Sequence, residues 1–168
     1  TIVEENKAGA DGAIAGAEVA KAPPDGYTLL MATNSPMAVA PAMKKVPPYD
    51  PVNDFTPITD IGRYTFFLFA YAGLPQKTLA ELIAYAKANP GKLAYATGNT
   101  TGIVSFAQFS SLAGIQMLHV PYKGEPAAIT DLIAGRVQLI FATPTTGVAH
   151  VKDGKLRAIV TSLRQRSP

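Results

Sequence analysis

The sequence predicts an α/β protein, built from short strands and helices that alternate along the chain. Fourteen glycines and fourteen prolines divide its 168 residues into short units, as is typical of βαβ architectures. Hydrophobic residues make up 48% of the chain and charged residues only 16%, a composition that predicts a folded core rather than disorder. From residue 92 onward, three strand–helix units follow in series, which predicts a parallel sheet with right-handed crossovers.

The first third of the chain contains short predicted elements separated by clear breaks. Pro23-Pro24-Asp25-Gly26 ends the first helix, and Thr33-Asn34-Ser35-Pro36 offers an N-cap with proline in the first turn of the next one. Apolar runs between these breaks predict strands. In order, we expect a strand at 2–5, a helix at 13–21, a strand at 27–32, a short helix ending before 47, and a strand at 55–61.

The remaining two thirds show a more regular pattern. Residues 63–72 are rich in aromatic and apolar residues and predict a strand that is covered on both faces. Thr78 and Glu81 have the spacing of a capping box, so a helix begins there and ends at Asn89-Pro90-Gly91. Beyond it we expect strands at 92–97, 117–122, 137–141 and 156–161, alternating with helices at 101–112, 126–134 and 144–152.

The side chains available argue against catalysis and metal binding. Because the chain has no cysteine, disulfides, thiolate metal sites and cysteine nucleophiles are excluded. Its two histidines, His119 and His150, have no nearby carboxylate at triad or metal spacing, and Glu125 and Asp131 are not spaced as a catalytic pair. We therefore expect a protein that is not an enzyme and that uses no metal and no cofactor.

Charge and hydropathy argue against two classes of partner. The net charge is +3, but five of the fifteen basic residues fall in the last seventeen positions, which predicts a basic tail rather than a nucleic-acid surface. The longest apolar stretch, 64–74, is too short to cross a bilayer as a helix. The first residues show neither the basic nor the apolar region of a targeting segment.

Polar loops follow three of the predicted strands, at 97–102, 120–124 and 141–147. Each carries groups that suit an ordinary cap or turn, but the carboxyl ends of parallel strands share one edge of a sheet, where ligands bind. Helix N-termini at that edge favour anions. Loop 97–102 does not match the phosphate-loop pattern, so a nucleotide is not expected. Together the loops predict a site for a small anion, with Lys123 as a candidate charge partner.

Four phrases of the sequence, taken in order, carry a resemblance to a known family. They are APPDGYTLL at 22–30, PYDPVNDF at 48–55, KTLAELIAYA at 77–86 and HVPYKG at 119–124. With these phrases the chain resembles, over essentially its whole length, the extracytoplasmic substrate-binding proteins of tripartite tricarboxylate transporters, the Bug receptors.

The resemblance implies a periplasmic, monomeric solute receptor with a type II periplasmic-binding-protein fold. Such a receptor closes two lobes over a small mono- or dicarboxylate and delivers it to membrane permease subunits of the transporter. We expect lobe one at 1–70, with 156–168 returning to it, and lobe two at 71–155. The matching ligand positions are Thr33, Asn34, Gly98, Asn99, Thr100, Thr101, Tyr122, Lys123 and Thr143.

The chain also departs from the family pattern. The family's N-terminal strand, ligand loop and first helix, and its C-terminal part, are expected to lie outside this sequence. Ile103 stands where the family often has histidine, and Ala142 where it often has aspartate, so a ligand with an amino group is disfavoured. The alternative interpretation is the effector-binding domain of a transcription regulator or signalling sensor with the same two-lobed fold.

Overall fold

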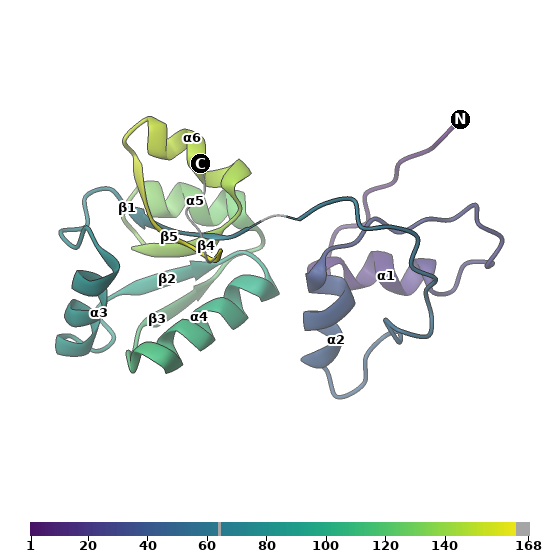
Figure 1. Ribbon diagram of the computed structural model, residues 1–168, viewed down its shortest axis with the longest axis horizontal. Coiled ribbons are helices and arrows are strands. Elements are labelled where there is room, and N and C mark those ends of the chain that lie inside the picture. The colour runs from purple at the N-terminus through teal and green to yellow at the C-terminus, as the bar shows by residue number, and fades with distance from the viewer. Residues whose placement is uncertain (64, 164–168) are drawn as a thin grey trace. The chain divides into compact units, whose positions relative to one another are not determined.

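The computed structural model of the protein describes residues 1–63 and 65–163. The chain forms two compact units, Thr1–Ile61 and Gly62–Pro168, which are coloured purple to blue and teal to yellow in Figure 1. The second unit contains the strands and the longer helices, and it holds most of the predicted ligand positions.

The second unit is built on one mixed sheet of five strands. They are β1 (Phe67–Tyr71), β2 (Ala94–Thr97), β3 (Leu118–Pro121), β4 (Leu139–Ala142) and β5 (Leu156–Thr161). Their spatial order is β3-β2-β4-β1-β5. Strand β2 runs parallel to β3 and β4, as the three strand–helix units predict, whereas β1 pairs antiparallel with both β4 and β5. The predicted α/β class is confirmed, with a sheet that is mixed rather than wholly parallel.

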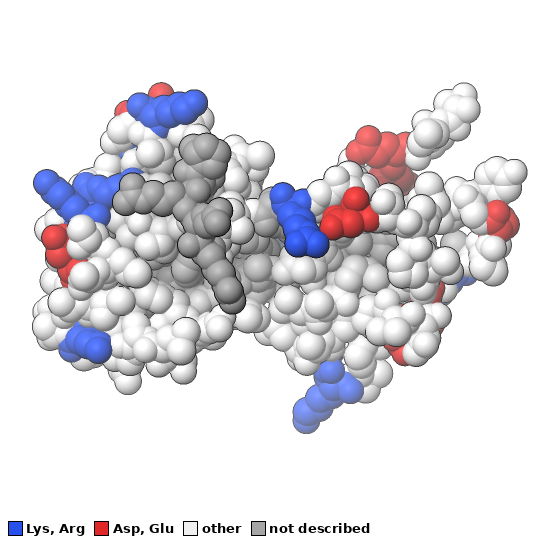
Figure 2. Space-filling view, in the orientation of Figure 1, with Lys and Arg blue, Asp and Glu red and all other residues white. Residues whose placement is uncertain are grey.

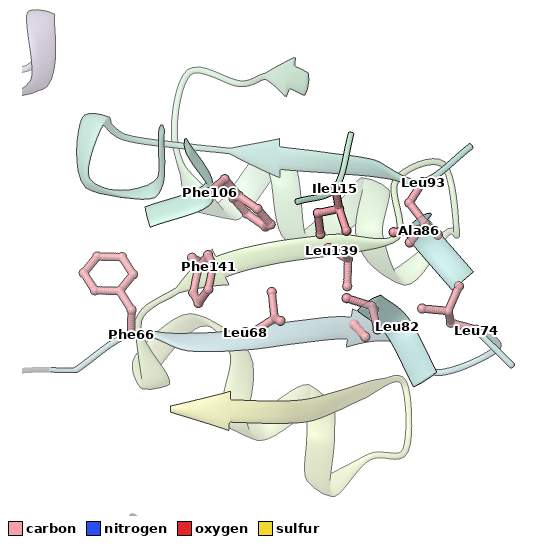
Figure 3. Close-up of a cluster of buried hydrophobic side chains, with 11 residues drawn as sticks. Phe66, Leu68, Leu74, Leu82, Ala86, Leu93, Phe106, Ile115, Leu139 and Phe141 are labelled. Atoms are coloured by element: carbon pink, nitrogen blue, oxygen red, sulfur yellow. The ribbon is translucent and has the colours of Figure 1, made fainter. Parts of the chain in front are cut away.

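Four helices cover the two faces of this sheet: α3 (Leu79–Ala88), α4 (Thr100–Ala113), α5 (Glu125–Ile133) and α6 (Pro144–Lys152). Leu82 and Phe106, from α3 and α4, are buried in one apolar cluster with Leu68 of β1, which Figure 3 shows in close-up. Ile129 of α5 packs in a second cluster with Phe69 of β1. Because successive side chains of a strand point to opposite faces, β1 contributes to both clusters, and its predicted burial on both faces is confirmed.

The capping box predicted at the start of α3 is present. The hydroxyl oxygen of Thr78 accepts from the Glu81 N–H at 3.2 Å, and Glu81 Oε2 accepts from the Thr78 N–H at 3.3 Å. The same carboxylate oxygen accepts from the Lys77 N–H at 2.7 Å, and these bonds lower the pKa of Glu81. Residues 77–81 therefore supply the hydrogen-bond partners for the start of α3 from the local sequence.

The first unit is a small assembly of short helices around Tyr49. It contains η1 (Ala10–Gly12), α1 (Ala13–Val19), η2 (Ser35–Val39) and α2 (Ala40–Ala42), so both predicted helices are confirmed. The buried Tyr49 donates its hydroxyl hydrogen to the Pro36 carbonyl oxygen at 2.5 Å. A Cβ on Gly16 would lie 2.6 Å from the Tyr49 ring. Glycine at position 16 is therefore what allows this ring to pack against α1.

Three predicted strands are wrong. In the described part of the chain, residues 2–5, 27–32 and 55–61 form no strand. Tyr27 and Met31, in the predicted strand at 27–32, are 92% and 84% exposed. A strand needs a neighbour for its N–H and C=O groups, and the first unit supplies no strand partner to these segments.

The division into units also differs from the predicted lobes. The boundary falls between Ile61 and Gly62, whereas the sequence placed it at residue 70 and returned 156–168 to the first lobe. In the structure β1 and β5 lie in the same sheet as β4, because Leu68 pairs with both Phe141 and Val160. The division into two lobes at residue 70 stays a prediction.

One residue of the predicted basic tail has a structural role. Arg157 lies in β5, and its guanidinium donates to three carbonyl oxygens of the segment after β1, at 3.0 to 3.2 Å, those of Ala72, Leu74 and Gln76. Of the other four basic residues, Arg164 and Arg166 lie outside the described residues. Arg157 therefore fixes the path of the chain from β1 toward α3.

Candidate functional site

The candidate site lies at the carboxyl edge of strands β2, β3 and β4. Because these strands are parallel neighbours in the order β3-β2-β4, the loops that follow them meet at one edge. Asn99, Gly124 and Thr143 immediately precede helices α4, α5 and α6. The predicted convergence of the three polar loops is thus present, and three helix N-termini, which carry partial positive charge, are directed to the same region.

A buried carboxylate, that of Glu125, joins the three loops. Glu125 is the first residue of α5 and only 9% exposed. Its Oε1 accepts from Asn99 Nδ2 at 2.9 Å, in the loop before α4. Its Oε2 accepts from the Thr143 N–H at 3.1 Å and from the hydroxyls of Thr143 and Thr146 at 2.9 and 2.8 Å, at the start of α6. An anion of the protein itself therefore lies where the sequence predicted an anionic ligand.

Close backbone contact holds the β2–α4 loop against the start of α5. A Cβ built on Gly98 would lie 2.5 Å from the carbonyl carbon of Gly124 and 2.8 Å from Cα of Glu125, and it would also collide with the Glu125 nitrogen. Only glycine permits this approach. Gly98 therefore contributes to the site by letting two loops touch.

Asn99 connects Glu125 to helix α4. Its Oδ1 accepts from the Gly102 N–H at 2.8 Å, while its Nδ2 donates to Glu125. The amide is thus oriented with its acceptor toward the helix and its donor toward the carboxylate, as its two partners require. Asn99 is the N-cap of α4, and the NH₂ group of its side chain joins this cap to Glu125.

Thr100 presents a buried polar atom without a partner. The residue is 7% exposed, and its Oγ1 has no hydrogen-bond partner among the described residues. Thr100 is the first residue of α4, where N–H groups lack intrahelical acceptors. Its neighbour Thr101 is half-buried in the same turn. A buried hydroxyl without a partner costs about 1–3 kcal/mol, so the start of α4 carries an uncompensated donor in the described structure.

The hydroxyl of Tyr122 bonds to α5. It donates to Asp131 Oδ2 at 2.8 Å, and Arg136 Nη1 donates to Asp131 Oδ1 at 2.6 Å. These two bonds lower the pKa of Asp131, while burial and the bond to Asp131 raise the pKa of Tyr122. The Lys123 side chain is exposed. Tyr122 and Lys123 stay predicted ligand positions, with the Tyr122 hydroxyl already bonded.

Thr33 and Asn34 belong to the first unit. Both are exposed, and Asn34 immediately precedes η2, where its side chain makes no capping bond to that helix. They belong to a different unit from the three loops. Their part in a ligand site stays a prediction.

The two histidines lie in different surroundings. The ring of His119 stacks on Tyr95 at 5.0 Å between centroids, and its Nε2 lies 2.7 Å from Oγ1 of the buried Thr97. His150 lies in the last turn of α6, with a buried Nδ1 that has no partner in the described structure. Within residues 1–63 and 65–163, no group of three or more histidine, cysteine or acidic residues is placed to hold a metal.

The charged side chains seen in Figure 2 are scattered, and the helices of the described residues are not of the membrane-spanning type. On the face shown in Figure 2, lysine and arginine side chains lie in separate groups over both units, with aspartate or glutamate beside several of them. Among the helices of the described residues, none has the length and apolar character needed to span a bilayer.

The hydrogen bonds of Glu125 to the neighbouring loops were not predicted from the sequence, in which Glu125 and Asp131 only lack the spacing of a catalytic pair. The usable signal was an acidic residue at the first position of a helix, directly after Gly124, at an edge where two other loops are rich in threonine and asparagine. Such loops supply donors to an internal carboxylate as readily as to a ligand.

Known proteins match the chain in sequence and in structure. The family model described as "Tripartite tricarboxylate transporter family receptor" matches residues 1–168. BugT of Bordetella pertussis is 34% identical over 172 residues, which cover 99% of this chain and 52% of BugT. The chain spans about half the length of the curated relatives that it matches.

Two solved structures of about 30% identity share the fold. The structure described as "R. palustris Rpa4515 with adipate" has a TM-score of 0.90 and 33% identity, over 98% of this chain and 56% of that one. MatC from Rhodopseudomonas palustris, with bound malate, has a TM-score of 0.83 and 28% identity, over 95% of this chain and 55% of that one. A structure of the periplasmic binding protein BugD also matches, and the predicted type II periplasmic-binding class is confirmed.

Proposed function

The chain belongs to the tripartite tricarboxylate transporter receptor family, as its sequence predicted, and from this premise we propose that it is part of a solute receptor for a small mono- or dicarboxylate. The receptor works in the periplasm as a monomer and passes its ligand unchanged to the membrane permease subunits of the transporter. In this proposal the carboxyl edge of β2, β3 and β4 provides one side of the ligand site.

The observation that carries the proposal is the unpartnered hydroxyl of Thr100 at the start of α4. An anion bound there would accept from this hydroxyl and from N–H groups of the first turn, and the helix N-terminus would favour its charge. The adipate and malate in the two related structures are dicarboxylates, and the same chemistry suits this edge. A carboxylate ligand accounts for a buried donor that the described structure leaves unpaired.

Replacement of Thr100 by valine separates ligand binding from folding. Thr100→Val removes the hydroxyl and keeps the shape, so the stability of the free protein should not fall, because the hydroxyl has no partner to lose. Affinity for a carboxylate should fall about ten- to a hundredfold, the equivalent of one hydrogen bond to a charged group, about 1.5–3 kcal/mol. The measurements are urea unfolding and calorimetric titration with adipate and malate.

Thr130→Val is the matched control. The Thr130 hydroxyl donates to the Pro126 carbonyl oxygen on the exposed side of α5, so its loss should leave carboxylate affinity unchanged. A thermal-shift screen that includes arginine, glucose and nucleotides tests the ligand class, and native mass spectrometry shows whether the ligand is recovered intact. Stabilisation only by sugars, amines or nucleotides, or turnover of the carboxylate, would contradict the proposal.

A further inference from the structure

We propose that Glu125 is a positioning residue that holds the start of α4 in its ligand-binding arrangement, acting through Asn99. This inference rests on the proposed function, because it assigns to a buried carboxylate the task of preparing the same site. The carboxylate is only 9% exposed and accepts four hydrogen bonds from two neighbouring loops. All four donors are neutral groups of Asn99, Thr143 and Thr146.

The location of the charge explains why it can stay buried. Thr143 is the residue before α6 and Asn99 the residue before α4, while Glu125 itself begins α5. A carboxylate is favoured near helix N-termini and by donors aimed at it. Without an anion, these donors and helix N-termini would lack a negatively charged partner, and Glu125 supplies one before any ligand arrives.

The effect on the ligand site passes through the orientation of one amide. Asn99 has one acceptor and one donor group at its end, and turning the amide exchanges them. Because Glu125 only accepts, it requires Nδ2 of Asn99 on its side and so leaves Oδ1 to accept from the Gly102 N–H at 2.8 Å. The direction of this one bond fixes the first turn of α4, where Thr100 presents its hydroxyl.

Glutamine at position 125 breaks this complementarity. If the glutamine oxygen still accepts from the three donors of Thr143 and Thr146, the glutamine NH₂ group faces the NH₂ group of Asn99. Asn99 must then turn, which removes the acceptor from the Gly102 N–H. Asn99→Asp alone produces the opposite mismatch, with two carboxylates facing each other. In the double variant, the glutamine NH₂ group donates to one aspartate oxygen, and the other aspartate oxygen accepts from the Gly102 N–H.

The test compares four proteins: wild type, Glu125→Gln, Asn99→Asp and the double variant. We expect each single variant to weaken adipate or malate binding by about tenfold or more, and the double variant to return within about threefold of wild type. Amide hydrogen exchange at Gly102 should be faster in both singles and restored in the double. Thr78→Ala, which removes the cap of α3, is the control for a general loss of stability and should change affinity less than about twofold.

Each outcome decides the inference. Recovery of affinity and of Gly102 protection in the double variant supports it, even if Glu125→Gln does not fold, because Asn99→Asp then provides the single-variant comparison. Wild-type affinity in Glu125→Gln overturns it, and so does a double variant that binds no better than the singles. If wild type binds no carboxylate at all, the proposed function fails, while the Gly102 exchange pattern still decides the role of Glu125.

Discussion

The sharpest structural prediction concerns Gly98, the residue at which the β2–α4 loop meets the start of α5. In Gly98→Ala the new methyl group would overlap backbone atoms of Gly124 and Glu125, at 2.5 and 2.8 Å for the two carbon atoms. Backbone at the start of a helix cannot rotate away as a side chain can. The loops must therefore separate, which costs about 1–3 kcal/mol of overpacking. It also weakens the bond from Asn99 to Glu125, a charged-group bond of about 1.5–3 kcal/mol.

Urea unfolding should therefore show Gly98→Ala destabilised by about 2–5 kcal/mol. Gly102→Ala, in the first turn of α4, is the comparison variant, since its Cβ would meet its neighbours at 3.5 Å or more. Alanine within α4 should leave stability unchanged or raise it by up to about 1 kcal/mol. Equal stability and equal carboxylate affinity in the two variants would refute the account of loop contact at Gly98.

Two other predictions concern charged groups of the second unit. Because hydrogen bonds from Tyr122 and Arg136 lower the pKa of Asp131, its contribution to stability is present above the unfolded pKa of about 3.9 and is lost as pH falls through the lower folded pKa. Asp131→Asn should therefore be less stable than wild type at neutral pH and lose less stability between about pH 4 and pH 2, measured by thermal melts. Arg157→Met leaves three carbonyl oxygens of residues 72–76 without their donor and should lower the free energy of unfolding by about 1.5–3 kcal/mol in urea titrations, whereas a change below about 0.5 kcal/mol would contradict the role of Arg157.

Elements of the fold that have local signals were predicted correctly, whereas elements that depend on distant partners were not. The elements from residue 67 onward have strong local signals, such as the Thr78–Glu81 capping box and the glycine at the end of α4, and their order alone indicated the parallel part of the sheet. In contrast, the runs at 2–5, 27–32 and 55–61 have only apolar character in common with strands. Strand formation depends on a pairing partner that a single run does not reveal, and these three predictions were wrong.

The site was predictable as a place and only partly as a set of contacts. Threonine- and asparagine-rich loops after parallel strands indicated the carboxyl edge, and the structure brings these loops together. The identity of the acceptor was not predictable in the same way. Whether a donor at such an edge bonds to a ligand or to a side chain of the protein depends on distances across three loops. The sequence does not give these distances.

The presence of Glu125 divides the donors of this edge into two groups. The N–H and hydroxyl of Thr143, the hydroxyl of Thr146 and the amide of Asn99 all bond to the internal carboxylate. Thr100, at the start of α4, keeps a buried hydroxyl that bonds to none of these groups. A second carboxylate placed at the donors of α6 would have to displace Glu125 from hydrogen bonds that it already accepts. We therefore expect a ligand carboxylate at this edge to be bound by the first turn of α4, while α6 serves the site indirectly by holding Glu125 in place.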